Sequence, residues 1–453
     1  MEDRSVCLWL PLPLLSLGPL LALLYTICVW LTYAINGEIP WNSKGTAMSI
    51  RLSLMVVSVA IALGLCHQTT IDKQDNVNQS ILNNNNTWSI LVLAVATILL
   101  GGISVYCMIQ TRQDDVVGIS KAPFYGPQSL KGKLILITGA NNGIGKETAH
   151  QLALMGATVV LLCRSVSRAE SAVQELLQRS PTSNNISKQQ FVIIPLDLGD
   201  FASIHAAVKI FKDQFPNQTV DVLINNAGLM MGNPTLSNDG LELMMQANHL
   251  GHFLLTKLLL DQKLLLVANN GGSPSRVINL TSSTYTMSHS RGGFDFQDMF
   301  CEKAIRPYTL FGQYSMTKLA NILFTKQLSR KYDTQSLQVF AVHPGIVRTN
   351  VTSNMNWYWR IPNDLFAIFV AMLQKTPAEG AYSTVFVAAA PEADLPPSGS
   401  YIVNCQAHPT LAIANSLEDA QQLWKVSEEL VNNCNNNNKD KSLLNQQTKK
   451  GDH

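Results

Sequence analysis

Tyr314 and Lys318 stand four residues apart, in the segment Tyr-Ser-Met-Thr-Lys. On a helix, residues four apart share one face, so the phenol and the ammonium would lie side by side. A tyrosine, whose ordinary pKa is about 10, is a weak acid–base catalyst at neutral pH, but a nearby cation favours the phenolate and lowers that pKa. The pair could therefore pass a proton to or from a substrate oxygen. With 11 tyrosines in the chain, the spacing can also arise by chance, so the surrounding sequence must decide.

A glycine-rich turn follows an apolar run that ends at Thr138 and precedes a helical pattern that reaches Met155. Glycine permits a tight turn and a close approach of the backbone, and the start of the helix offers unpaired N–H groups. Between a strand and a helix, such a turn is typical of a site for a dinucleotide pyrophosphate, although turn glycines are also common elsewhere. The turn residues predicted to contact this cofactor are Gly139, Asn141, Gly143, Ile144 and Gly145.

Arg164 follows the second apolar run, at the position where an acidic residue would bind the ribose 2′-hydroxyl of NAD. An arginine suits a 2′-phosphate instead, because its guanidinium donates paired hydrogen bonds to phosphate oxygens. This charge argument favours NADP(H) over NAD(H). The alternative is a solvated arginine at the end of a strand.

The elements around these residues alternate between short β-branched runs and stretches of helical periodicity, from about residue 131 to residue 431. Continuous apolar strands joined by helical crossovers predict a parallel sheet covered on both faces, the doubly wound α/β fold of the Rossmann type. The predicted strands are residues 134–138, 158–163, 191–196, 220–224, 276–280 and 338–342.

Several separated motifs follow one another in a familiar order. The glycine turn, Asn225-Asn226-Ala227-Gly228 after a strand, Asn248, Ser282 and the Tyr/Lys pair make residues 131–431 similar to the short-chain dehydrogenase/reductase family. The segments 248–253 (Asn-His-Leu-Gly-His-Phe), 314–324 and 343–349 (His-Pro-Gly-Ile-Val-Arg-Thr) resemble its retinol-dehydrogenase-like branch.

The resemblance implies a role for each matching residue. Tyr314 would be the general acid–base and Lys318 its electrostatic partner and ribose ligand. Ser282 would orient the substrate oxygen, although Thr281 and Ser283 are adjacent hydroxyls, and Asn248 would hold a proton-relay water. Asp197 would contact the adenine. The cofactor cleft would be lined by Asn226, Ala227 and Gly228. The segment that runs beside the nicotinamide would contain Pro344, Gly345, Val347 and Thr349.

The composition predicts a membrane anchor. Apolar residues make up 46% of the chain and charged residues only 14%, against about 25% charged residues in soluble globular proteins. The excess lies in three uncharged stretches near residues 6–35, 50–68 and 88–110. The last is long enough to cross a bilayer as a helix, whereas the second is short. We therefore expect two or three transmembrane helices over residues 1–112, followed by a linker over residues 113–130.

The loops between these stretches indicate an orientation. Glycosylation sequons at Asn78 and Asn85 place the second loop in the lumen. With three spans, the catalytic domain would then be cytosolic, on a multi-pass protein of the endoplasmic reticulum. With two spans, either the catalytic domain would lie in the lumen or the N-terminus would lie on the opposite side of the membrane from the three-span arrangement.

The remaining features exclude other classes of function. A net charge of +2 and the lack of a Lys/Arg stripe argue against a nucleic-acid partner. The eight cysteines form no CxxC pair, so neither a metal site nor a disulfide framework is implied. Residues 432–453 are rich in Asn, Lys and Gln and are predicted to be a disordered tail.

The substrate is predicted only by class. The apolar segment 357–373 lies where the family covers its substrate, so it could be a lid over a lipophilic alcohol or carbonyl, an ordinary core helix, or a segment that dips into the bilayer. Retinoids are the substrates that the branch suggests, with steroids and polyprenols as alternatives. The alternative from another functional class is a non-catalytic membrane scaffold that binds a nucleotide. Family members often pair through the helices that flank the sheet, so a homodimer is possible.

Overall fold

The computed structural model describes residues 126, 128–179, 186–265, 273–301, 307–347 and 375–448, with side chains to residue 433 except at 290 and 291. All of them belong to the second of two compact units, Met1–Thr111 and Arg112–His453. The predicted spans, the segment 357–373 and Thr349 lie outside the described residues. Among the described helices, none is both long and apolar enough to traverse a bilayer.

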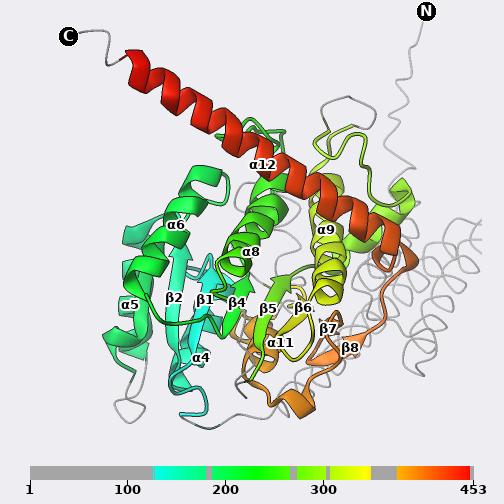
Figure 1. Cartoon of the computed structure of the whole chain (residues 1–453). Helices are drawn as coiled ribbons and strands as arrows, with labels where there is room; N and C mark the ends of the chain where they lie inside the picture. Colours follow the sequence, from blue (N-terminus) through cyan, green and yellow to red (C-terminus); the bar gives the residue numbers. More distant parts are fainter. Residues whose placement is uncertain are drawn as a thin grey trace, which may run out of the picture. The chain divides into compact units, whose positions relative to one another are not determined.

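The strands form one sheet of eight, in the order β3-β2-β1-β4-β5-β6-β7-β8 (Figure 1). All neighbouring pairs are parallel except β7 and β8, which form an antiparallel hairpin at the edge. The six predicted strands all form, with bounds within two residues of those predicted, and β7 and β8 were not predicted. The strands are β1 (Leu134–Thr138), β2 (Thr158–Cys163), β3 (Phe191–Pro195), β4 (Val222–Asn225), β5 (Ser275–Leu280), β6 (Leu337–His343), β7 (Tyr401–Val403) and β8 (Gln406–His408).

Both faces of the sheet are buried, which explains the continuous apolar strands. In β1, Ile135 and Ile137 belong to the core on one face, and Leu134 and Leu136 to the core on the other. Successive strand side chains point to opposite faces, so every residue of such a strand must be apolar. The first face is covered by α4 (Gly143–Leu154), α5 (Val166–Arg179) and α11 (Pro377–Ala389), and the second by α6 (Phe201–Gln214), α8 (Gly251–Asp261) and α9 (Leu310–Lys331).

The helix that leads into α8 is irregular. The short α7 (Leu243–Met245) runs directly into a π-helical stretch, η3 (Gln246–Leu250), and then into α8. Single π-helical turns of this kind are rare and often lie at functional sites. Short 3₁₀ helices complete the described part: η2 (Lys188–Gln190), η4 (Ser283–Arg291), η6 (Glu392–Asp394) and η7 (Ala412–Ala414).

The final helix, α12 (Leu417–Thr448), packs against α9 and also contacts α8 (Figure 1). Its Trp424 ring lies 5.0 Å from the Phe253 ring and 5.9 Å from the Phe324 ring, measured between centroids. The helix continues to Thr448, which corrects the prediction of a disordered tail from residue 432. Adding a residue to an existing helix costs far less than starting one, so the packed first half supports a polar extension.

Candidate functional site

The predicted site residues follow the carboxyl ends of six neighbouring strands. The chain crosses the sheet in one direction from β1 to β3 and in the other from β4 onward, so the order reverses between β1 and β4. In open α/β sheets, ligands bind in the crevice beside this switch point. The glycine turn follows β1, Arg164 follows β2, Asp197 follows β3, residues 226–228 follow β4, Ser282 follows β5 and residues 344–347 follow β6. The fold therefore places all of them at one edge of the sheet.

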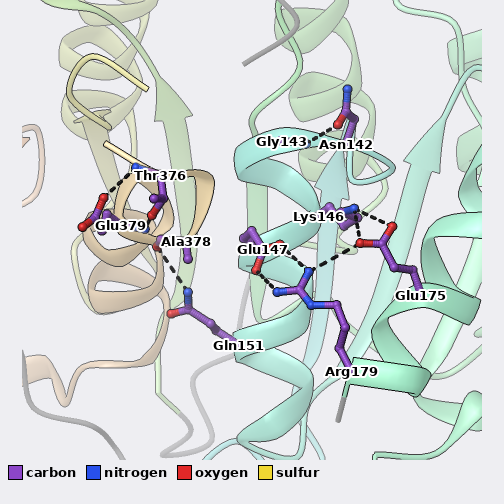
Figure 2. Close-up of polar contacts among 10 residues, drawn as sticks. All are labelled: Asn142, Gly143, Lys146, Glu147, Gln151, Glu175, Arg179, Thr376, Ala378 and Glu379. Carbon is purple, nitrogen blue, oxygen red and sulfur yellow. Dashed lines mark hydrogen bonds and ion pairs between the residues drawn. The ribbon is translucent and has the colours of Figure 1, made fainter. Parts of the chain in front are cut away.

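The turn between β1 and α4 needs its glycines. Gly139 and Gly143 have φ of +65° and +54°, in the left-handed region that favours glycine. A Cβ on Gly145 would lie 2.6 Å from the Gly139 carbonyl oxygen and closer still to the Asn226 amide. Asn142 caps α4, because its Oδ1 accepts from Gly143 N at 2.8 Å (Figure 2). The turn therefore packs tightly and ends at the start of a helix, where an anionic group is favoured.

Thr138, at the end of β1, ties this turn to the loop after β4. Its Oγ1 accepts from Asn226 N and Ala227 N, both at 2.9 Å. The same oxygen lies 2.9 Å from His252 Nε2, while His252 Nδ1 lies 3.1 Å from the Asn248 carbonyl. A carbonyl only accepts, so Nδ1 carries the proton and Nε2 accepts from the threonine. Neither Thr138 nor His252 was predicted, although Thr138 directly precedes the glycine turn.

The loop after β4 lies close to the predicted catalytic groups. The Asn226 amide donates to the Thr138 carbonyl at 2.7 Å, which holds the loop against β1. A Cβ on Gly228 would lie 3.5 Å from Lys318 Nζ and 3.7 Å from Asn248 Oδ1. The predicted cofactor loop and two predicted catalytic residues thus share one region.

Lys318 is a buried cation. Its side chain lies on α9, the residue is 3% exposed, and Nζ donates to the Leu280 carbonyl at 3.2 Å. Burial lowers its pKa to about 8. Nζ lies 5.4 Å from the centroid of the Tyr314 ring, so the two residues share a helix face as predicted.

The phenol of Tyr314 behaves differently from the prediction. Burial raises its pKa above the ordinary value, because a phenolate loses hydration there. In the chain by itself, burial therefore outweighs the lowering of this pKa that was expected from Lys318. Tyr314 stays protonated at neutral pH, and its side chain is still partly exposed at the site.

The three adjacent hydroxyls after β5 have separate roles. Thr281 is buried, and its Oγ1 donates to the Lys318 carbonyl at 2.9 Å. Ser283 is also buried, at 3% exposure. Ser282 is half-buried, and its Oγ accepts from Thr284 N at 3.2 Å, which caps η4 and leaves the hydroxyl proton available to donate. The geometry favours Ser282 as the hydroxyl that can reach a substrate.

Asn248 lies in the π-helical stretch η3, and both the oxygen and the nitrogen of its side-chain amide form hydrogen bonds. Its Oδ1 accepts from Leu229 N at 2.8 Å, and its Nδ2 donates to the Leu229 carbonyl at 3.0 Å. The same nitrogen lies 3.2 Å from Thr317 Oγ1 on α9. The side chain therefore joins the loop after β4 to the helix that carries Tyr314.

The side of the glycine turn that faces α5 carries paired charges (Figure 2). Lys146 Nζ lies 2.8 Å from both carboxylate oxygens of Glu175, and this pairing lowers the pKa of the glutamate. Arg179 donates to the buried Glu147 at 2.7 Å. Arg164 is exposed and forms no ion pair within the described residues, so its charge is available to an incoming anion. Asp197 Oδ1 accepts from Gly199 N at 2.9 Å after β3.

The segment after β6 turns at Gly345, where φ is +84°. A Cβ there would lie 2.9 Å from Lys375 Nζ, which in turn donates to Asn404 Oδ1 at 2.5 Å. Pro344, Gly345 and Val347 are half-buried. Lys375, which was not predicted, therefore holds this segment beside the edge of the sheet.

Comparison with known proteins places the chain in a family. Residues 133–293 match the family described as short chain dehydrogenase. Retinol dehydrogenase 14 of Mus musculus is 37% identical over 312 residues, which cover 67% of this chain and 87% of that protein. Retinol dehydrogenase 12 of Homo sapiens is 39% identical over 305 residues, with the same coverage. A Pseudomonas aeruginosa RhlG/NADP complex is 22% identical, with a TM-score of 0.45, and the match covers 61% of this chain and 96% of that one.

Proposed function

Because the chain belongs to the short-chain dehydrogenase/reductase family, in its retinol-dehydrogenase-like branch, we propose that it is a membrane-anchored oxidoreductase. It transfers a hydride between NADP(H) and a retinoid-like alcohol or carbonyl compound. Relatives named as retinol dehydrogenases support the lipophilic substrate. One observation carries the proposal: Lys318 Nζ, 5.4 Å from the centroid of the Tyr314 ring, donates to the carbonyl of Leu280, the last residue of β5 before Ser282, at the sheet edge where the glycine turn also lies.

The residues present suit a nicotinamide dinucleotide. A side chain at Gly139 or Gly145 would collide with the packed backbone of this region, since a Cβ would lie 3.1 Å from Ala227 Cα in the first case and 2.6 Å from the Gly139 carbonyl in the second. Glycine therefore keeps the turn tight and leaves its backbone uncovered by side chains at these two positions. The pyrophosphate would lie at this turn, and the exposed Arg164 would meet a 2′-phosphate. When bound, the cofactor supplies or accepts the hydride.

The chain itself moves the proton. Tyr314 is protonated at neutral pH, so its hydroxyl can donate to a carbonyl oxygen and take the proton back in the reverse direction. The available proton of Ser282 can donate to the same oxygen and orient it. Lys318 lies near enough to the ring to stabilise the phenolate that forms on donation. An abundant supply of NADPH would drive the reaction toward reduction of the carbonyl compound.

Replacing Tyr314 with Phe tests this mechanism. In detergent-solubilised full-length protein, oxidation of NADPH with all-trans-retinal should slow by about 100-fold or more, as expected for loss of a general acid. NADPH binding should persist, because the phenyl ring remains. Tyr332→Phe at the end of the same helix is the matched control and should keep full activity. Unchanged turnover in Tyr314→Phe would remove the proposed acid.

The anchor and the cytosolic orientation are part of the same proposal. They are supported by the three uncharged stretches before residue 112 and by the sequons at Asn78 and Asn85. Mapping of attached glycans in cells is the test. A glycan on Asn217, in the catalytic domain, would place that domain in the lumen.

A further inference from the structure

Glu242 is a buried carboxylate that the proposed mechanism does not use. It is 2% exposed and stands directly before α7, on the chain that leads to Asn248. Its Oε1 accepts from Met244 N at 2.9 Å and its Oε2 from Met245 N at 2.8 Å. These two charge-assisted hydrogen bonds already cap the start of α7.

The same carboxylate also reaches α9. Gln313 Nε2 donates to Glu242 Oε2 at 2.8 Å and to the Met299 carbonyl at 3.0 Å, and Gln313 Oε1 accepts from Cys301 Sγ at 3.3 Å. Gln313 is 3% exposed and directly precedes Tyr314. The bond between Glu242 and Gln313 joins segments 71 residues apart, and it is additional to what a helix cap requires.

A second link joins the same two helices on the other side of the tyrosine. Asn248 Nδ2 lies 3.2 Å from Thr317 Oγ1, so the cross-links meet α9 at positions 313 and 317. Tyr314 lies between them. If the link at 313 is lost, the first turn of α9 is free to shift against η3, and the phenol moves with it. A misplacement of about 1 Å in a catalytic group can lower a rate by about 100-fold.

We propose that Glu242 is a positioning residue: through Gln313 it fixes Tyr314 relative to Asn248 and the substrate oxygen. The role rests on the proposed function, because it assumes that Tyr314 is the proton donor. The bond needs an acceptor at 242 and a donor at 313. Removing either partner should therefore lose the same contribution to kcat, and removing both should lose it only once.

The experiment compares Glu242→Gln and Gln313→Met with the double variant Glu242→Gln/Gln313→Met in the full-length protein, using NADPH and all-trans-retinal. In Glu242→Gln, an amide must serve both the α7 N–H groups and the Gln313 donor, so at least one donor faces another donor. We expect kcat to fall by about 10- to 100-fold, while the KM for NADPH changes little. Gln313→Met, which removes the donor at similar length, should reproduce this loss even if Glu242→Gln does not fold. The double variant should be about as slow as the slower single variant, because both changes break the same bond.

Hydrogen exchange of the first turns of α9 gives a readout that does not need turnover. Exchange over residues 310–318 should rise in both single variants and rise no further in the double variant. Val208→Ala, in the α6 core at 2% exposure, is the control for general destabilisation and should change neither kcat nor this exchange. Equal kcat in Glu242→Gln and Val208→Ala, or losses that multiply in the double variant, overturn the positioning role. If the wild-type protein is inactive toward retinal, the proposed function fails, and the exchange data alone decide the positioning role.

Discussion

Thr138→Val removes one hydroxyl at the point where the glycine turn meets the loop after β4. Valine has the same shape as threonine, so packing is kept and only hydrogen bonds are lost. Three groups lose this contact: Asn226 N, Ala227 N and His252 Nε2, each 2.9 Å from the hydroxyl oxygen. Asn226 N keeps a second acceptor, the Ile224 carbonyl at 3.0 Å, so two groups are left unpaired. A polar group left unpaired in the interior costs about 1–3 kcal/mol. Since Ala227 is half-buried, we expect a loss of about 2–4 kcal/mol.

Thermal unfolding of the solubilised full-length protein measures this loss. At about 2 °C per kcal/mol for a domain of this size, Tm should fall by about 4–8 °C. NADPH binding should also weaken, because the affected loop lines the predicted cofactor cleft. The matched control is Thr148→Val on α4, where Thr148 Oγ1 is fully buried and has no hydrogen-bond partner in the described part of the chain.

The control should behave in the opposite way. Removing an unpaired buried hydroxyl removes a cost, so Thr148→Val should leave Tm unchanged or raise it slightly. The two variants change the same atoms, and only the hydrogen bonds differ. A Tm for Thr138→Val as high as that of Thr148→Val would refute the assignment of Thr138 as the link between the two loops.

Two further outcomes are expected. Arg164→Asp should lower the ratio of kcat/KM for NADPH to kcat/KM for NADH by about 10- to 100-fold, because it removes a charged hydrogen-bond donor. Steady-state assays with both cofactors check this, and an unchanged ratio would argue against recognition of the 2′-phosphate by Arg164. His249, His252 and His343 are buried, and burial lowers their pKa to about 4, 3 and 3. The unfolded chain therefore binds more protons than the folded chain below pH of about 6.5, and the free energy of unfolding should fall by about 1.4 kcal/mol per pH unit for each histidine between about pH 6 and 4. Denaturant unfolding across that range checks it, and a flat profile would contradict neutral burial.

The strands that a sequence reveals best are those buried on both faces. In β1 and β2 every position except the terminal Thr138 and Thr158 is apolar, so a nearly unbroken run marks each strand, and the predicted bounds were correct. β7 and β8 have three residues each and are joined by Asn404 and Cys405, which have φ of 49° and 62°. Without a glycine in the turn and with runs this short, no local pattern distinguishes the hairpin from a loop.

Site residues that act at strand ends could be predicted, and those that support them could not. The positions of Ser282 and Arg164 follow from the strands that precede them. The partner of a buried polar side chain, in contrast, is set by tertiary contact: Thr138 and His252 are 114 residues apart in sequence. The protonation of Tyr314 likewise depends on how much water the folded chain excludes, which residue spacing does not record.

The placement of α12 affects how two copies of the chain could associate. Ser427 Oγ lies 2.9 Å from His249 Nε2, Glu428 pairs with Lys257 at 3.1 Å, and Trp424 contacts rings on both α8 and α9. The chain thus uses its own last helix to cover these two helices. A second subunit that docked on the surface covered by α12 would first have to displace this helix together with its partly buried indole.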